Sequence, residues 1–189
     1  FAMRIESMKI LGAVPSTSSL AVFSNLRHLR LSRPYNRIGP ADLSLVIGLT
    51  QLQRLDLSET RATDLAALAG LTHLKHLDLH GTQVRDVTAL AGLNHLQHLV
   101  LWATQVSDVT ALAGLTQLQR LDLCDTQVSD VTALAGLTQL QHLDLRDTQV
   151  GDVTALASLT QLQDLSLWNT LVSEVAADAL AALLPTCRI

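Results

Sequence analysis

The chain is poor in aromatic residues, in cysteine and in long apolar runs. Only 3% of its 189 residues are aromatic although 48% are hydrophobic, so the core must be built from leucine, valine and alanine. Apolar runs such as 179–184 fall short of the roughly 20 residues that span a bilayer, so we expect a soluble protein without membrane insertion. The chain does not begin with methionine, which suggests a fragment, and residues 1–19 do not resemble a secretory signal.

The chain also lacks an excess of basic residues. Its formal net charge is -4, whereas proteins that bind nucleic acid or an anionic membrane surface carry clustered lysine and arginine. We therefore expect neither partner. Two cysteines are too few for a disulfide framework, so the compartment stays open between the cytoplasm and secretion.

What the sequence does have is a repeat of 22 residues. Leucine recurs at this spacing at Leu49, Leu71, Leu93, Leu115, Leu137 and Leu159, and threonine at Thr60, Thr82, Thr104, Thr126, Thr148 and Thr170. The blocks GTQVRDVTALAGL, ATQVSDVTALAGL, DTQVSDVTALAGL and DTQVGDVTALASL are near copies, which indicates duplication or consensus-like engineering. A period of this length predicts a solenoid of stacked units.

Each unit reads LxxLxxLxLxxTxVxDVxxLAx. Around Leu77 and Leu79 apolar and polar residues alternate, which is typical of a short strand with one buried face. Asp86 can accept backbone N–H bonds at the start of a turn, and Gly92 can adopt a left-handed conformation at its end, so 86–92 predicts one helical or 3-10 turn. We interpret the recurring aspartates as turn caps rather than as a metal-binding ladder: Asp64, Asp86, Asp108, Asp130 and Asp152.

Stacked units of this kind bury one another's leucines and place their strands side by side, about 4.8 Å apart. The pattern resembles the leucine-rich-repeat family over essentially the whole chain, specifically the 22-residue class of bacterial internalin-like proteins. The resemblance implies an α/β leucine-rich-repeat solenoid: a right-handed curved arc with a parallel concave β-sheet and short helical or 3-10 turns on the convex side. The family usually has Asn where this sequence has Thr60 and its equivalents, and that Asn bridges neighbouring turns. We expect a threonine ladder with fewer hydrogen bonds than an amide would make.

The repeat predicts a single solenoid over 1–189. Within it we expect a degenerate N-terminal repeat at 1–22, an irregular repeat with a longer loop at 23–48 and regular 22-residue repeats at 49–170. Residues 171–189 are expected to form a capping helix and strand, because an open solenoid end would expose core leucines.

The alternation within the strands should expose three columns of side chains on the concave sheet. The first is cationic or titratable and runs Ser7, His28, Arg54, His76, His98, Arg120, His142 and Asp164. The second is mostly acidic and runs Lys9, Arg30, Asp56, Asp78, Val100, Asp122, Asp144 and Ser166. The third runs Leu11, Ser32, Ser58, His80, Trp102, Cys124, Arg146 and Trp168. Opposite charges in neighbouring columns could simply keep the sheet soluble, or could form a polar surface for a partner of matching charge.

The third column holds both tryptophans of the chain. Trp102 and Trp168 do not belong to the repeated leucine core, because the alternation places them on the concave face. Exposed tryptophan near arginine is typical of a binding hot spot. Arg146 is the neighbour of Trp168, which would allow a cation–π contact. We therefore predict a partner-binding site on Trp102, Arg146 and Trp168, completed by His80, His98, His76, Arg120 and Tyr35. The alternative is that the two rings only cover apolar surface.

Histidine and cysteine side chains could bind a metal ion or form a disulfide. His76 and His98 could share a metal ion, but no third ligand converges on them, so we expect no bound metal and instead a surface that titrates near pH 6. Cys124 is expected to be a free thiol on the concave surface, too far from Cys187 for a disulfide.

The function predicted from these residues is a non-catalytic module or scaffold that binds a partner protein on its concave surface. A structural spacer, or a substrate-recognition domain of a larger multidomain bacterial protein, is the alternative. A hydrolase is the enzyme class considered, but no nucleophile elbow, phosphate loop, HxxxH helix or CxxC motif occurs. We expect a monomer with no catalytic residues and no cofactor.

Overall fold

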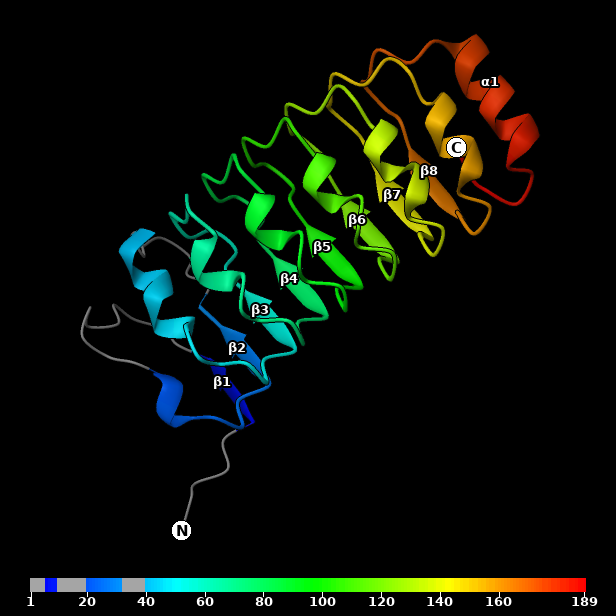
Figure 1. The fold of residues 1–189 in the computed structure, drawn as a ribbon. Coiled ribbons are helices and arrows are strands. Elements are labelled where there is room, and N and C mark those ends of the chain that lie inside the picture. Colours follow the sequence, from blue (N-terminus) through cyan, green and yellow to red (C-terminus); the bar gives the residue numbers. More distant parts are fainter. Residues whose placement is uncertain (1–5, 10–19, 32–39) are drawn as a thin grey trace.

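Eight short strands run through the described part of the chain and form one parallel sheet in sequence order, β1 to β8 (Figure 1). The structure is a computed structural model that describes residues 6–9, 20–31 and 40–189. The strands are β1 (Ser7–Lys9), β2 (His28–Arg30), β3 (Arg54–Asp56), β4 (His76–Asp78), β5 (His98–Val100), β6 (Arg120–Asp122), β7 (His142–Asp144) and β8 (Asp164–Ser166).

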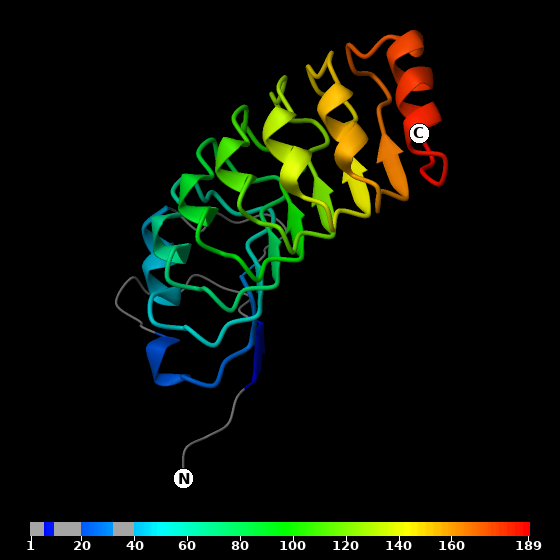
Figure 2. The same cartoon turned by 45° about the vertical axis from the view of Figure 1, so that its right-hand side comes forward.

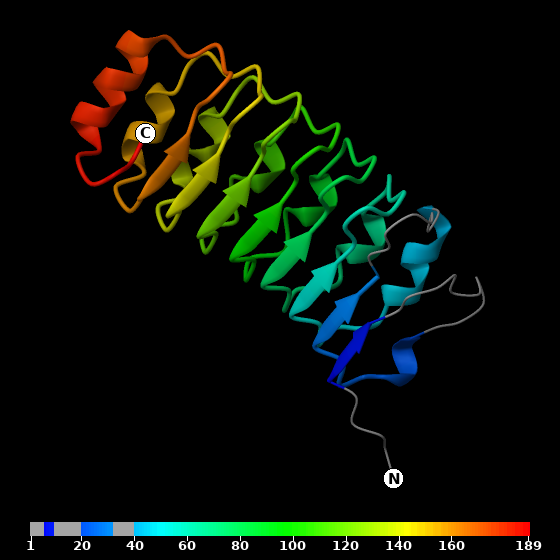
Figure 3. The ribbon, with the colours of Figure 1, turned by 180° about the vertical axis from the view of Figure 1, so that it is seen from behind.

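A 3-10 turn follows each of the first seven strands on the opposite side of the coil (Figure 1). The turns are η1 (Leu20–Val22), η2 (Pro40–Val46), η3 (Ala66–Leu68), η4 (Thr88–Leu90), η5 (Thr110–Leu112), η6 (Thr132–Gly136) and η7 (Thr154–Ser158). The stack bends so that the sheet lies on the concave side and the turns on the convex side (Figure 2). Figure 3 shows the sheet from its concave face, with the strands side by side. The predicted leucine-rich-repeat arc is confirmed.

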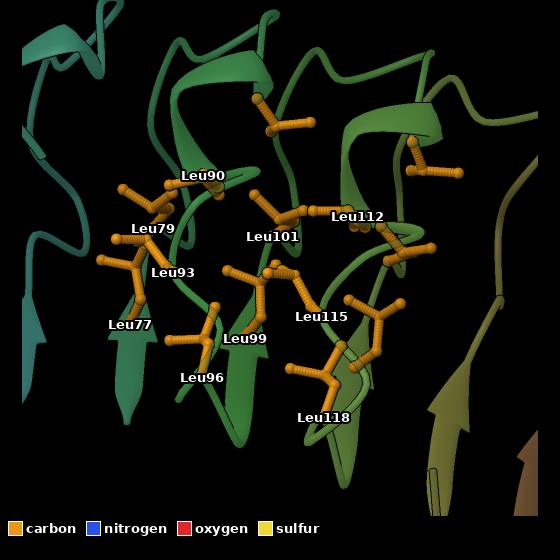
Figure 4. Close-up of a cluster of buried hydrophobic side chains, with 14 of the residues drawn as sticks. Leu77, Leu79, Leu90, Leu93, Leu96, Leu99, Leu101, Leu112, Leu115 and Leu118 are labelled. Carbon is orange, nitrogen blue, oxygen red and sulfur yellow. The ribbon is translucent and has the colours of Figure 1, made fainter. Parts of the chain in front are cut away.

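The strands stay in register because each one carries a buried leucine at its centre. Leu77 of β4 lies beside Leu55 of β3 and Leu99 of β5, and all three are at most 1% exposed. Leucines from the strands and from the convex turns interlock between repeats (Figure 4). A unit of this size could not bury its own leucines, so each repeat is stabilised by its neighbours.

The aspartate at the start of each convex turn from η3 to η7 acts as a cap. In η4, the Asp86 carboxylate accepts the backbone N–H of Thr88 at 2.8 Å, and the same bond recurs at η3, η5, η6 and η7. This bond also holds the pKa of Asp86 below its ordinary value. The prediction that these aspartates are turn caps is confirmed.

The residue with a left-handed backbone conformation, that is with a positive φ, is not at the position in the repeat that the sequence suggested. Gly92 has no positive φ, whereas the position just after the concave face has one in every regular repeat. That position is occupied by Glu59, Gly81, Ala103, Asp125, Asp147 and Asn169. The chain must turn sharply away from the sheet there, while the convex turn ends with its last residue still in a right-handed conformation, as at Ala91 with φ -55°. Only one of these left-handed positions is a glycine, so most repeats carry some backbone strain.

The conserved spacing of threonine has a local rather than a bridging role. The Thr104 hydroxyl donates to the carbonyl oxygen of Leu101 in its own repeat at 2.7 Å, and its equivalents do the same. Each threonine thus satisfies a turn carbonyl, as expected. The expected ladder between repeats is instead made by the backbone, for example by the Gln105 N–H and the Val84 carbonyl oxygen at 3.0 Å. A hydroxyl is too short to reach the next turn as an amide would.

The C-terminal end differs from the repeats before it. The α-helix α1 (Glu174–Leu183) replaces the 3-10 turn and packs on η7, and Ser173 caps it by accepting the N–H of Ala176. Arg188 then pairs with Asp164 beyond β8. The boundaries of the four expected segments stay predictions. No helix in the described part of the chain is long and apolar enough to cross a membrane.

Candidate functional site

We call the three columns of concave side chains the first, second and third rows. The first row, from Ser7 to Asp164, lies in register from β1 to β8. At its centre the rings of His76 and His98 stack, with centroids 4.3 Å apart and planes 13° from parallel. Burial, followed by the neighbouring charges of Arg54, His98, Lys75 and His28, lowers the pKa of His76 to about 4. Burial, followed by Arg120, also lowers the pKa of His98. The expectation that this surface titrates near pH 6 is therefore wrong for the histidine pair, because the alternation placed the adjacent cations but did not show that the two rings are partly buried.

Two arginines flank the histidine pair. Arg54 of β3 lies beside His76, and Arg120 of β6 lies beside His98. Both side chains are exposed, and neither forms an ion pair with any residue that the structure describes. A shallow groove of about 250 Å³ lies over β3 to β5, and His76, His98 and Arg54 line it together with Asp56, Asp78 and Val100.

The second row is less exposed than the alternation predicted. Asp78 and Asp122 are half-buried, and their carboxylates accept the backbone N–H of the residue two positions on, at 3.0 and 3.1 Å. Asp56 and Asp144 make the same bond, so the second-row aspartates close the turn that leaves the sheet. Burial raises the pKa of Asp78 and of Asp122. This role was not predicted from the sequence, although an aspartate two residues before a turn position is its recognisable signal.

Two other aspartates of the second row are paired with arginines. Arg30 of the same row pairs with Asp56 at 2.9 Å, and the guanidinium of Arg146, in the third row, donates through Nε and Nη2 to the two carboxylate oxygens of Asp144. Val100 interrupts the acidic row at β5, beside His98 on the same strand. The centre of the concave face therefore carries the His76 and His98 rings and Val100 between two exposed guanidinium groups, with the half-buried Asp78 beside them.

The third row places one tryptophan beside this centre. Trp102 is 44% exposed, and its indole stacks on the imidazole of His80 with centroids 4.8 Å apart and planes 9° from parallel. The Nε2 atom of His80 lies 2.9 Å from a carboxylate oxygen of Glu59, which fixes the ring beneath the indole. This contact orients Trp102 before any partner binds, so less side-chain entropy would be lost on binding.

Cys124 is not on the open surface where the sequence placed it. It is 8% exposed, and burial raises the pKa of its thiol to about 11. Ser58 of the same row is also buried. Small side chains on a concave sheet are covered by the longer residues around them, which the period of alternation alone does not reveal. Both cysteines are free, as expected.

The predicted site residues fall into separate groups. His80 and Trp102 form one stack, His76 and His98 form another, and Arg120 lies beside the second. Trp168 is 70% exposed but lies three repeats from Trp102. Arg146 lies between them in the row and is held by Asp144. Tyr35 lies outside the described residues.

Arg54 and Val100 belong to the centre of the face but were not among the predicted site residues. The sequence could have indicated both residues, because the alternation of apolar and polar residues had already placed Arg54 in the first column and Val100 in the second. Within 6–9, 20–31 and 40–189, no group of three or more His, Cys, Asp or Glu side chains is placed to hold a metal ion.

Comparison with known proteins identifies the repeats. The family model described as leucine-rich repeats, in two copies, matches residues 116–158. No curated protein sequence matches the chain.

Solved structures resemble the chain more broadly. An internalin (inlF) from Listeria monocytogenes is 27% identical over 89% of the chain, with a TM-score of 0.82. Internalin C2 (inlC2) from the same species is 37% identical over 81% of the chain, with a TM-score of 0.72. The ectodomain of the Arabidopsis thaliana receptor kinase GASSHO1/SCHENGEN3 shares the fold, at 23% identity over 80% of the chain, 19% of its own length and a TM-score of 0.68.

The chain spans 48% of the length of the first internalin and 64% of the second. The family match, the 22-residue register and these structural neighbours agree with one another. The chain has the leucine-rich-repeat fold, with repeats that match the family model at 116–158 and structural neighbours of the bacterial internalin type.

Proposed function

We propose that the chain is a recognition module that binds a partner protein on its concave face. Leucine-rich-repeat folds are commonly protein-interaction modules and are typically non-catalytic. The observation that carries the proposal is the exposed indole of Trp102, stacked on His80 in the two repeats that also carry His76 and His98. A preoriented aromatic side chain with exposed arginines nearby is the composition of a binding hot spot.

The shape of the face supports the same function. Eight strands present a continuous concave surface on which side chains from separate repeats can contact one partner at once. Trp168 and Arg146 extend this surface towards the C-terminal end, where Trp168 is exposed. The structure of the Arabidopsis receptor ectodomain is of a complex with CASPARIAN STRIP INTEGRITY FACTOR 2, which shows that a leucine-rich-repeat ectodomain can hold a partner.

The test is an affinity capture from lysate in which the unaltered chain is compared with a triple variant, Trp102→Ser, Arg146→Glu, Trp168→Ser. Proteins retained only by the unaltered chain are identified by mass spectrometry. Each is then purified and its affinity for both chains is measured by calorimetry. We expect the triple variant to bind at least about a hundredfold more weakly, because hot-spot side chains each contribute about 2 kcal/mol or more.

A matched control carries the same kinds of change away from the concave face. Ile47→Ser with Arg85→Glu removes an exposed apolar side chain and reverses an exposed arginine on the turn side. This control should keep full affinity, and thermal melting should show that both variants stay folded. Equal binding by the unaltered chain and the triple variant would contradict the proposal and favour a spacer.

A further inference from the structure

Four side chains form a line across the centre of the concave face. Arg54, His76, His98 and Arg120 lie on consecutive strands in direct register, so their side chains form one line across the sheet. The two guanidinium groups at the ends of this line are exposed and form no ion pair with any described residue. An exposed cationic pair of this kind is a site for two carboxylates.

We propose that this line binds an extended acidic segment of the partner, with two carboxylate side chains four residues apart. The proposal rests on the recognition function proposed above and names the chemistry of the segment recognised there.

The spacing follows from the two geometries. Arg54 and Arg120 are separated by three strand intervals, which is about 14 Å. An extended chain advances about 3.3 Å per residue and alternates its faces, so side chains four residues apart lie on the same face about 13 Å apart. Each carboxylate can then meet one guanidinium.

The residue midway between the two carboxylates would lie over the histidine pair. The two imidazoles stack on each other, so their facing planes are covered and a further side chain would contact the ring edges, which carry the nitrogen atoms. Ring nitrogens can donate to or accept from a neutral polar side chain at that position. Because the two rings are uncharged at neutral pH, the two arginines supply the positive charge along this part of the line.

The second row determines the direction in which the segment lies. A segment that ran along β3 would place one face over Arg54 and then over Asp56, so an acidic segment would be attracted and repelled in turn. The same holds for Arg120 and Asp122 on β6. A segment that crosses the strands along the first row meets the arginines and keeps about 7 Å from the acidic row. The charge pattern therefore favours crossing the strands.

The experiment uses fluorescein-labelled peptides and the full chain, with binding followed by fluorescence anisotropy. One peptide carries two glutamates four residues apart in a serine and threonine background. A second carries them three residues apart, which places them on opposite faces about 10 Å apart, and a third carries glutamine in their place. We expect the first peptide to bind about tenfold more tightly than the second, because only it uses both arginines.

The variants test the two contacts separately. Arg54→Gln and Arg120→Gln should each weaken binding of the first peptide about tenfold, whereas Arg85→Gln, an exposed arginine in the turn before η4, should leave it unchanged. The double variant Arg54→Glu, Arg120→Glu should instead bind a peptide with two lysines at the same spacing. This exchange of specificity requires a folded chain, so it also excludes simple loss of structure.

Two results would overturn the proposal: equal binding of the two glutamate peptides, or equal weakening by Arg85→Gln and Arg54→Gln. Either result leaves the recognition function itself standing if capture of a partner still depends on Trp102. If capture does not depend on Trp102 while the spacing rule holds, the proposed hot spot is wrong and the acidic-segment site is retained.

Discussion

His76 and His98 stack face to face across two parallel strands, 4.3 Å between ring centroids, with a guanidinium group on either side. A protonated imidazole is poorly tolerated there, because the ring is partly buried and its neighbours are cationic. The pair therefore fills the centre of the face without adding charge at neutral pH. The first prediction therefore concerns the stability of the chain at acidic pH.

The unfolding free energy should decrease as the pH falls from about 6.5 towards 4. The pKa of His76 is about 4 in the folded chain and near 6.5 when unfolded, so the unfolded chain binds more protons throughout this window. Urea unfolding at several pH values checks this prediction. The variant His76→Gln should lose less stability over the same window than the unaltered chain, whereas His73→Gln, an exposed histidine that stacks on His95 and not on this pair, should follow the unaltered chain. An identical slope for all three chains would contradict it.

Removal of the threonine hydroxyl should destabilise the repeat stack. Thr104 is 5% exposed, and its hydroxyl donates to the Leu101 carbonyl oxygen at 2.7 Å. Thr104→Val keeps the shape of the side chain but leaves that buried carbonyl without this donor, which should cost about 1 to 3 kcal/mol. Denaturant titration measures the change. The exposed Thr116→Val is the matched control and should change stability by less than about 0.5 kcal/mol.

Glycine should stabilise one alanine position and destabilise another. Ala103 has φ 53°, a left-handed conformation in which a Cβ is strained, so Ala103→Gly should raise the unfolding free energy by about 1 kcal/mol. Ala113 has φ -54° at the end of η5, so Ala113→Gly should lower it by roughly 0.5 to 1 kcal/mol. Thermal melting of the two variants should show shifts of opposite sign. Shifts of the same sign would mean that strain at Ala103 is relieved elsewhere.

The sequence predicted those features that depend on the period of the repeat. The spacing of Leu77 and Leu79 gave the strand, its buried face and the stacking of repeats, and it placed His76 beside His98. It did not reveal that Cys124 is buried, since the size of the neighbouring side chains decides that. Nor could it choose between Gly81 and Gly92 for the left-handed position, because glycine permits that conformation without requiring it.

Burial of Cys124 leads to the last prediction, which concerns its reactivity. The variant Cys187→Ser leaves Cys124 as the single thiol of the chain. Burial, with Asp144 nearby, raises the pKa of Cys124 to about 11 from an ordinary value of 9.0, so near neutral pH its thiolate fraction falls roughly a hundredfold. Alkylation by iodoacetamide, followed by mass spectrometry, should be at least that much slower in the folded chain than in urea. Alkylation at equal rates in the two conditions would show that the thiol is open to solvent, and that the third row does not cover it.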